Sequence, residues 1–382
     1  MIYKYTINKE IIMDFNREYM LRAIELAKKG EGGVNPNPLV GAVIVKEGRI
    51  IGEGYHARYG ELHAERNAFS NLTEDAEGAD MYVTLEPCCH YGKQPPCTLA
   101  IVEHKIKRVF VGSNDPNDKV AGKGIEYLRE HGVEVFTEVM KEECDALNPV
   151  FFHYITSHTP YVVLKYAMTM DGKIATAEGF SKWITGESAR AHVQTLRNKY
   201  MGIMVGIGTV IKDNPMLNCR IPGGRNPIRI VCDSNLSIPI ECNLVNTAGD
   251  IRTIVATKEG NDKKDELKDK VAALNNAGIE IMYVKSDNGM VDMRDLMYRL
   301  GELKIDSILL EGGGNLNYSA LKAGIVNEAL VYMAPKIFGG KDAISPVEGD
   351  GVNTPDNCFG FDLKNVENID NDILLTYTKK EG

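Results

Sequence analysis

The segment TLEPCCHYGKQPPC, residues 84–97, constrains the fold of this chain more than any other stretch, because it gathers three cysteines and one histidine. The chain starts with mixed charged and apolar residues and shows no signal-peptide pattern, so we expect a cytoplasmic protein. Thiols stay reduced in the cytosol, and clustered cysteines there bind metal or take part in catalysis. A thioredoxin-like redox pair would need the spacing C-x-x-C, which this segment lacks. The segment therefore predicts a metal site.

Upstream of this segment, His63-Ala64-Glu65 lies where a helix is expected to begin. A catalytic zinc ion takes three protein ligands and keeps a fourth position for water, and His63, Cys88 and Cys97 would supply one imidazole and two thiolates. Cys97 begins another predicted helix, whose N-terminus stabilises a thiolate. Glu65 is too near His63 in sequence to be an obvious further ligand. A carboxylate beside a zinc-activated water is suited to proton transfer, so we predict that Glu65 is the catalytic acid–base group.

Two interpretations without catalysis stay open at this point. In the first, Cys89 or His90 supplies a fourth ligand and closes a purely structural zinc site. In the second, the chain is a zinc-stabilised nucleotide-binding module that keeps the same cysteines. Neither interpretation has a use for Glu65, and both are therefore disfavoured.

Composition and charge limit the number of domains and the kinds of partner. The chain has 382 residues, of which 43% are hydrophobic and 25% charged, enough for two domains with separate cores. The formal net charge is −9, and residues 1–157 and the remainder are both acidic. A protein that follows a nucleic-acid backbone normally carries a positive surface, so we expect no nucleic-acid partner. No apolar run is long enough to span a membrane, and we expect a small-molecule substrate.

The order of predicted elements indicates two α/β domains. In the first half, helix and strand patterns alternate around one sheet up to about residue 145. Residues 146–160 are predicted to form a connector, after which strand and helix patterns start again. We expect the first domain at residues 14–150 and the second at residues 160–380.

A glycine-rich turn marks a second candidate site. The predicted strand 307–310 leads into EGGGNL, residues 311–316, and then into a run compatible with a helix. Positions without side chains at a helix N-terminus let the backbone approach a phosphate, although glycines also serve ordinary turns. Residues 206–211, GIGTVI, lack the third glycine of a Rossmann fingerprint, so that fold is not predicted.

The motifs around the metal site resemble the zinc-dependent cytidine and nucleobase deaminase superfamily, whose usual cysteine spacing is P-C-x-x-C. Here Cys88 and Cys97 are nine positions apart. This spacing, with NPNPLVG at 35–41, DPN at 115–117 and AGKG at 121–124, resembles the deaminase half of the bifunctional riboflavin-biosynthesis deaminase/reductase family. The resemblance implies a cytidine-deaminase-like α/β/α domain with a mixed sheet, which hydrolytically deaminates 2,5-diamino-6-(5-phosphoribosylamino)pyrimidin-4(3H)-one. It assigns substrate binding to Asn37, His56, His90 and Lys93. Residues 1–13 fall outside the family pattern.

Four motifs of the second half resemble the reductase half of the same family: LKYAMTMDGKIA from residue 164, SKWIT from 181, TVIKDNPMLNCR from 209 and EGGGNL from 311. The resemblance implies a dihydrofolate-reductase-like α/β domain that uses NADPH to reduce 5-amino-6-(5-phosphoribosylamino)uracil at C1′ of its ribose. It assigns NADPH binding to Ala167, Trp183, Thr209, Asp213, Ser234, Gly313, Gly314 and Asn315. It assigns substrate binding to Ser181, Arg197, Leu217, Arg220 and Glu311.

Some of these assignments have competing interpretations. We predict that Arg197 and Arg220 bind the substrate phosphate, because a guanidinium makes two parallel hydrogen bonds to it; the alternative is solvated arginines in surface ion pairs. Trp183, the only tryptophan, would either stack on a ligand ring or pack in the core. A rival for the whole chain is a tRNA-adenosine-type deaminase fused to an unrelated reductase, which the acidic charge and the cysteine spacing disfavour. We also expect a homo-oligomer.

Overall fold

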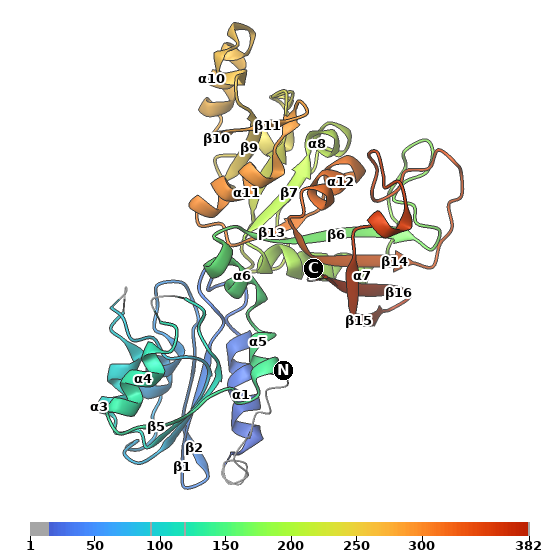
Figure 1. Ribbon diagram of the computed structural model, residues 1–382. Coiled ribbons are helices and arrows are strands. Elements are labelled where there is room, and N and C mark those ends of the chain that lie inside the picture. The colour runs from blue at the N-terminus through green and yellow to red at the C-terminus, as the bar shows by residue number, and fades with distance from the viewer. Residues whose placement is uncertain (1–14, 92–93, 118–119, 381–382) are drawn as a thin grey trace. The chain divides into compact units, whose positions relative to one another are not determined.

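The computed structural model describes residues 15–91, 94–117 and 120–380. The chain forms two compact units, Met1–Thr156 and Ser157–Gly382, shown in Figure 1. Among the described residues, no helix combines the length and the apolar character needed to cross a lipid bilayer.

The first unit is built on a mixed sheet. Within its described part, five strands lie in the order β2 (Arg49–Tyr55), β1 (Gly41–Lys46), β3 (Asp80–Leu85), β4 (Arg108–Ser113) and β5 (Glu134–Phe136). β1 runs antiparallel to both of its neighbours, whereas β3, β4 and β5 are parallel. The carboxyl ends of parallel strands meet at one edge, so the segments after β3 and β4 come together there.

Helices cover both faces of this sheet (Figure 1). Side chains alternate along a strand, so Val43 and Val45 face α1 (Arg17–Lys28) and α5 (Lys141–Asp145), while Ala42 and Ile44 face the opposite helices. Those opposite helices are α2 (Ala64–Ser70), α3 (Cys97–Glu103) and α4 (Lys123–Glu130). The predicted α/β/α layering with a mixed sheet is confirmed.

Gly54 allows α2 to lie close to the sheet. A Cβ atom at Gly54 would lie 2.2 Å from the backbone nitrogen of Ala68 and 2.4 Å from the carbonyl oxygen of Ala64, closer than real Cβ atoms approach. Only glycine therefore fits at this point of β2. The close contact sets the position of α2, which carries His63 at its N-cap and Glu65 in its first turn.

The second unit contains a larger sheet. Its described strands lie in the order β10 (Ile279–Val284), β9 (Thr253–Lys258), β8 (Ile228–Cys232), β7 (Gly202–Gly206), β13 (Ser307–Leu310), β6 (Tyr161–Thr169), β14 (Val326–Ala334), β16 (Asp372–Lys379) and β15 (Phe361–Ile369). The strands from β10 to β14 are parallel, and β16 and β15 are antiparallel to their neighbours. A short hairpin, β11 (Ser286–Asp287) and β12 (Met290–Val291), forms a separate two-stranded sheet.

Helices also pack on this sheet. α11 (Met293–Glu302) and α12 (Gly314–Lys322) share one core with β6, β7 and β13, while α8 (Ile207–Asp213), α9 (Asn243–Asn246) and α10 (Lys268–Asn276) share another. α7 (Glu187–Lys199) precedes β7, and the short 3₁₀ turns are Asn261–Lys263, Asp265–Leu267 and Pro355–Asn357. The predicted connector at residues 146–160 contains the helix α6 (Pro149–Ser157). The TVIKD motif, which is predicted to bind the cofactor, lies on α8.

Candidate active sites

The three predicted metal ligands of the first unit come together from three elements. His63 is the N-cap of α2, Cys88 follows the end of β3, and Cys97 is the first residue of α3. His63 Nδ1 lies 3.5 Å from Cys88 Sγ and 3.4 Å from Cys97 Sγ, and all three ligand atoms lie within 4.8 Å of one another. Two sulfur donors and one imidazole nitrogen at these separations fit zinc, and they leave a coordination position for water.

The surroundings of Cys88 favour its thiolate. Hydrogen bonding by Cys97 and by His63 lowers the pKa of Cys88 to about 4, despite its burial. The thiolate is the form that binds metal. Among the described residues, neither Cys89 nor His90 belongs to the ligand group, so the closed four-ligand interpretation is not supported.

Glu65 lies beside this cluster without belonging to it. It is 3% exposed, and burial raises the pKa of its carboxyl group. Glu65 lines a cavity of about 270 Å³ together with His63 and Cys88. The geometry places a buried carboxyl group where an activated water and a substrate would meet, as acid–base catalysis requires.

The predicted substrate residues of the first unit line the same cavity, as far as they are described. Asn37, His56 and His90 are among its lining residues, whereas Lys93 lies outside the described residues. The Nδ1 atom of His56 lies 3.0 Å from the Leu62 carbonyl oxygen and therefore donates to it, so its Nε2 accepts from the Asn37 amide at 3.1 Å. Burial lowers the pKa of His56, which favours this neutral form.

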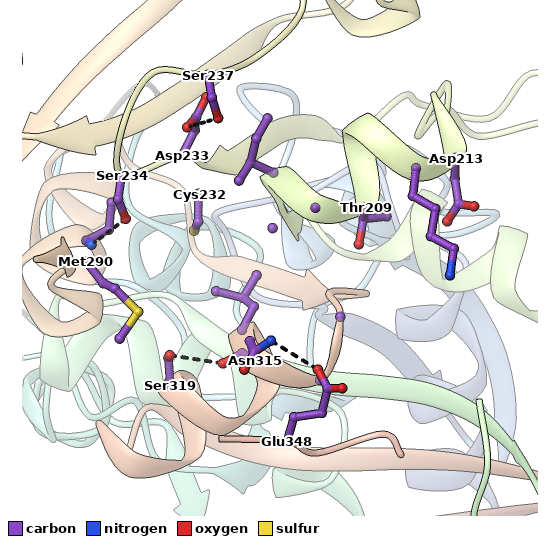
Figure 2. A pocket seen from close by; sticks show the side chains of 18 of the residues that line it. Thr209, Asp213, Cys232, Asp233, Ser234, Ser237, Met290, Asn315, Ser319 and Glu348 are labelled. Carbon is purple, nitrogen blue, oxygen red and sulfur yellow. Dashed lines mark hydrogen bonds between the residues drawn. The ribbon is translucent and has the colours of Figure 1, made fainter. Parts of the chain in front are cut away.

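A second cavity, of about 600 Å³, lies in the second unit (Figure 2). It is lined by the start of α8, the segment after β8 and the glycine-rich start of α12. The predicted residues that line it are Ser181, Thr209, Asp213, Ser234, Gly313, Gly314 and Asn315. Figure 2 shows Thr209 and Asp213 across the cavity from Asn315, whose amide donates to Glu348 Oε2 at 3.1 Å. A cavity of this volume bounded by a helix N-terminus suits a dinucleotide with its phosphates.

The remaining predicted residues of the second unit do not line this cavity. Trp183 is 63% exposed and lies under the Arg190 guanidinium, 4.6 Å from the ring centroid, so the core interpretation of this tryptophan is wrong. Ala167 lies on β6, and Leu217 is buried with a φ of 48°. Arg220 is exposed, and its side chain makes no hydrogen bond or ion pair with the described residues.

Arg197 and Glu311 form a buried ion pair. Arg197 Nε and Nη2 donate to the two Glu311 oxygens, each at 3.0 Å, and the side chains are 13% and 12% exposed. Lys165 Nζ lies 4.0 Å from Glu311 Oε2 and is 14% exposed. Although burial opposes ionisation, the charges of Arg197 and Lys165 lower the pKa of Glu311 to about 2. The interpretation of Arg197 as a solvated surface arginine is therefore wrong.

Comparisons with known proteins found matches for both halves of the chain. The model of the cytidine and deoxycytidylate deaminase zinc-binding region matches residues 13–113, and that of the RibD C-terminal domain matches residues 160–375. The riboflavin biosynthesis protein RibD of Actinobacillus pleuropneumoniae is 55% identical, over 94% of this chain and 94% of its own. The RibD of Aquifex aeolicus is 41% identical, over 97% of this chain and 100% of its own. The chain belongs to the RibD family.

Solved structures of RibD proteins share the fold. The diaminohydroxyphosphoribosylaminopyrimidine deaminase/5-amino-6-(5-phosphoribosylamino)uracil reductase of Thermotoga maritima is 40% identical, with a TM-score of 0.83 over 95% of this chain and 98% of that one. A RibD structure from Acinetobacter baumannii has a TM-score of 0.84 at 35% identity, with coverages of 95% and 98%. The predicted family, the deaminase and reductase activities in riboflavin biosynthesis, and the zinc and NADPH cofactors are confirmed.

Sequence reasoning missed some residues at both sites of this RibD family member. Asp115 and Asn117, which follow β4, line the metal-site cavity because β3 and β4 are parallel neighbours. Lys165 reaches Glu311 because β6 pairs with β13 in a register that aligns Leu164 with Leu310. The available signals were the DPN motif and a lysine within the apolar strand YVVLKYAM.

Proposed function

We propose that the first unit, within residues 14–150, hydrolytically deaminates 2,5-diamino-6-(5-phosphoribosylamino)pyrimidin-4(3H)-one at the His63–Cys88–Cys97 site. The observation that supports this is Glu65, a buried carboxyl group that lines the same cavity as the ligands His63 and Cys88 and does not belong to the ligand cluster. Bound zinc supplies a Lewis acid that activates water. Glu65 accepts a proton from that water and returns it to the amino group, which leaves as ammonia while the ring carbon gains oxygen.

Polar residues around the cavity hold the pyrimidine in this proposal. Neutral His56, fixed by Leu62 and Asn37, presents a ring of set orientation. Orientation of this kind contributes to the rate, because it removes the entropic cost of aligning substrate and catalyst. His90 completes the described part of the predicted set, and Lys93 stays a prediction.

The second unit, within residues 160–380, reduces 5-amino-6-(5-phosphoribosylamino)uracil in this proposal. NADPH supplies the hydride that C1′ of the ribose receives. The glycine-rich start of α12 and the residues around Thr209 and Ser234 hold the cofactor. Ala167 and Trp183 stay predicted cofactor contacts outside the cavity lining.

Three cationic side chains, Arg197, Lys165 and Arg220, lie near the Glu311 carboxylate and suggest separate roles. Arg197 uses its Nε and Nη2 donors on Glu311, so this edge is not available for the substrate phosphate. Arg220 lies close enough to contribute to the lowered pKa of Glu311, and its guanidinium is exposed. We therefore assign phosphate contact to Arg220 and orientation of Glu311 to Arg197 and Lys165, with Ser181 and Leu217 as further substrate contacts.

Selective removal of zinc tests this division of labour. Chelation of the purified chain is expected to abolish ammonia release while NADPH oxidation with the deaminated substrate continues, because the ligand cluster lies within the first unit. Both activities are measured on one preparation, with circular dichroism as the control for folding. Loss of both activities from a chain that stays folded would contradict the proposal.

The proposal also covers the cellular location and the oligomeric state of the enzyme. We place the enzyme in the cytoplasm, where reduced thiols such as Cys88 and Cys97 persist for metal binding. We propose a homo-oligomer, because β15 is an edge strand whose Leu363 and Val366 are 55% and 56% exposed. Light scattering on the purified chain measures this directly.

A further inference from the structure

Glu86 is a buried carboxylate that lines the deaminase cavity but has no part in the acid–base chemistry assigned to Glu65. It lies two residues before Cys88, at the end of β3, and is 4% exposed. Among the residues that the structure describes, no lysine, arginine or histidine forms an ion pair with it. An ionised carboxylate is costly to bury unless hydrogen-bond donors surround it, so its partners must come from elsewhere.

Backbone N–H groups provide those partners. Glu86 Oε2 accepts from Gly122 N at 3.0 Å and from Asp115 N at 3.4 Å. Oε1 accepts from Gly124 N at 3.0 Å and from Ile125 N at 3.3 Å. The donors belong to the segment after β4 and to the first turn of α4, whose partial positive charge favours a carboxylate.

The fold leaves little room around this contact. A Cβ atom at Gly124 would lie 2.2 Å from the Pro87 carbonyl oxygen and 3.2 Å from Glu86 Oε1. Gly122 has a φ of 83°, a left-handed conformation that favours glycine. The start of α4 is thus held directly against the residues that lead to Cys88.

The segment held by Glu86 also forms part of the deaminase cavity. Asp115, Asn117 and Val120 line it together with His63 and Glu65. The backbone N–H groups of Asp115 and Gly122 both donate to Glu86, so the carboxylate restrains the chain before Asn117 and after Val120.

We propose that Glu86 is a positioning residue for deamination, which fixes the backbone at Asp115 and Gly122 so that the side chains of Asp115, Asn117 and Val120 form a wall of the substrate cavity beside the metal site. Glu86 acts through its backbone contacts and not on the reacting atoms. The inference rests on the proposed deaminase function of the first unit. Deamination by the wild-type chain tests that function, whereas comparison of Glu86 variants with wild type tests the inference.

The decisive variant is Glu86→Gln, which keeps the shape but turns an amide NH₂ towards two N–H donors. Hydrogen bonds to charged groups are the stronger ones, so we expect deaminase KM to rise by at least about tenfold, with a smaller change in kcat. Zinc content and reductase activity should stay at wild-type values. Glu86→Asp, which keeps the charge, should recover part of the KM. Glu126→Gln is the matched control, because Glu126 is an exposed carboxylate on the same helix.

Gly124→Ala is an independent test of the proposal, because the added methyl group displaces the start of α4 while the Glu86 side chain stays unchanged. It too should raise deaminase KM with zinc retained. Reductase activity and circular dichroism of each variant report whether the chain is folded. Unchanged deaminase KM in folded Glu86→Gln, or a fall in kcat with KM unchanged, would overturn the proposal. Loss of zinc from Glu86→Gln would also overturn it, since Glu86 would then support the metal ligands.

Discussion

Arg197 on α7 and Glu311 after β13 meet through two parallel hydrogen bonds of 3.0 Å, with both side chains nearly buried. Paired hydrogen bonds of this geometry are the most specific that arginine makes with a carboxylate. Lys165 approaches the same carboxylate from β6 and lies 5.6 Å from the centre of the Tyr332 ring. Two cationic side chains of the second unit therefore surround one buried negative charge.

The low pKa of Glu311 predicts a loss of stability in acid. The folded value is about 2 and the ordinary value is 4.5, so the stabilisation is complete above about pH 4.5 and is lost as the pH falls towards 2. The shift corresponds to roughly 3 kcal/mol. Urea unfolding of wild type and Glu311→Gln, followed by circular dichroism, should show a difference in unfolding free energy near neutral pH that shrinks as the pH falls. A difference that does not change with pH would contradict this.

Arg220 should contribute to reduction through the substrate phosphate. Loss of a charge-assisted contact of about 1.5 to 3 kcal/mol predicts that Arg220→Ala lowers reductase kcat/KM by roughly ten- to a hundredfold. With a substrate that lacks the phosphate, wild type and variant should react equally well. Deamination and zinc content serve as controls within the same chain. Unaltered kinetics with the phosphorylated substrate would remove Arg220 from the site.

Replacement of Glu65 by glutamine should separate metal binding from proton transfer. The amide keeps the size of the side chain but cannot accept a proton, so deamination should fall by about 10² to 10⁴-fold. Zinc should stay bound, because the ligand cluster consists of His63, Cys88 and Cys97. Metal analysis and ammonia release on the same sample measure both quantities. If zinc is lost instead, Glu65 supports the metal site structurally.

Arg229 on β8 should be important for stability and not for catalysis. It is 0% exposed and donates to the carbonyl oxygens of Met216, Leu244, Thr247 and Ile251 and to the hydroxyls of Thr247 and Thr253. Arg229→Met removes all of these buried hydrogen bonds, so the unfolding free energy should fall by about 2 to 5 kcal/mol.

Arg252→Met is the control for Arg229→Met, because its ion pair with Glu280 is exposed and should change stability by about 1 kcal/mol or less. Thermal unfolding of the two variants, measured side by side, gives the comparison. Equal stability of the two variants would show that the hydrogen bonds of Arg229 contribute little.

Local patterns in the sequence determined the alternation of strands and helices, because side-chain periodicity and caps act over a few residues. They also determined the chemistry of the metal site, since His63, Glu65, Cys88 and Cys97 are of the residue types that a catalytic zinc site uses. In the structure, His63, Cys88 and Cys97 form one cluster, and Glu65 lines a cavity with His63 and Cys88.

Only the tertiary structure decided which side chains meet across the sheets. The backbone N–H groups that donate to the Glu86 carboxylate lie 29 to 39 positions from Glu86 in the sequence, and Arg197 lies 114 positions from Glu311. Strand order and register bring these residues together, and neither can be read from a single segment. Burial likewise depends on what packs above a residue, which is why Trp183 is exposed and Arg229 is buried, against the usual preferences of both residue types.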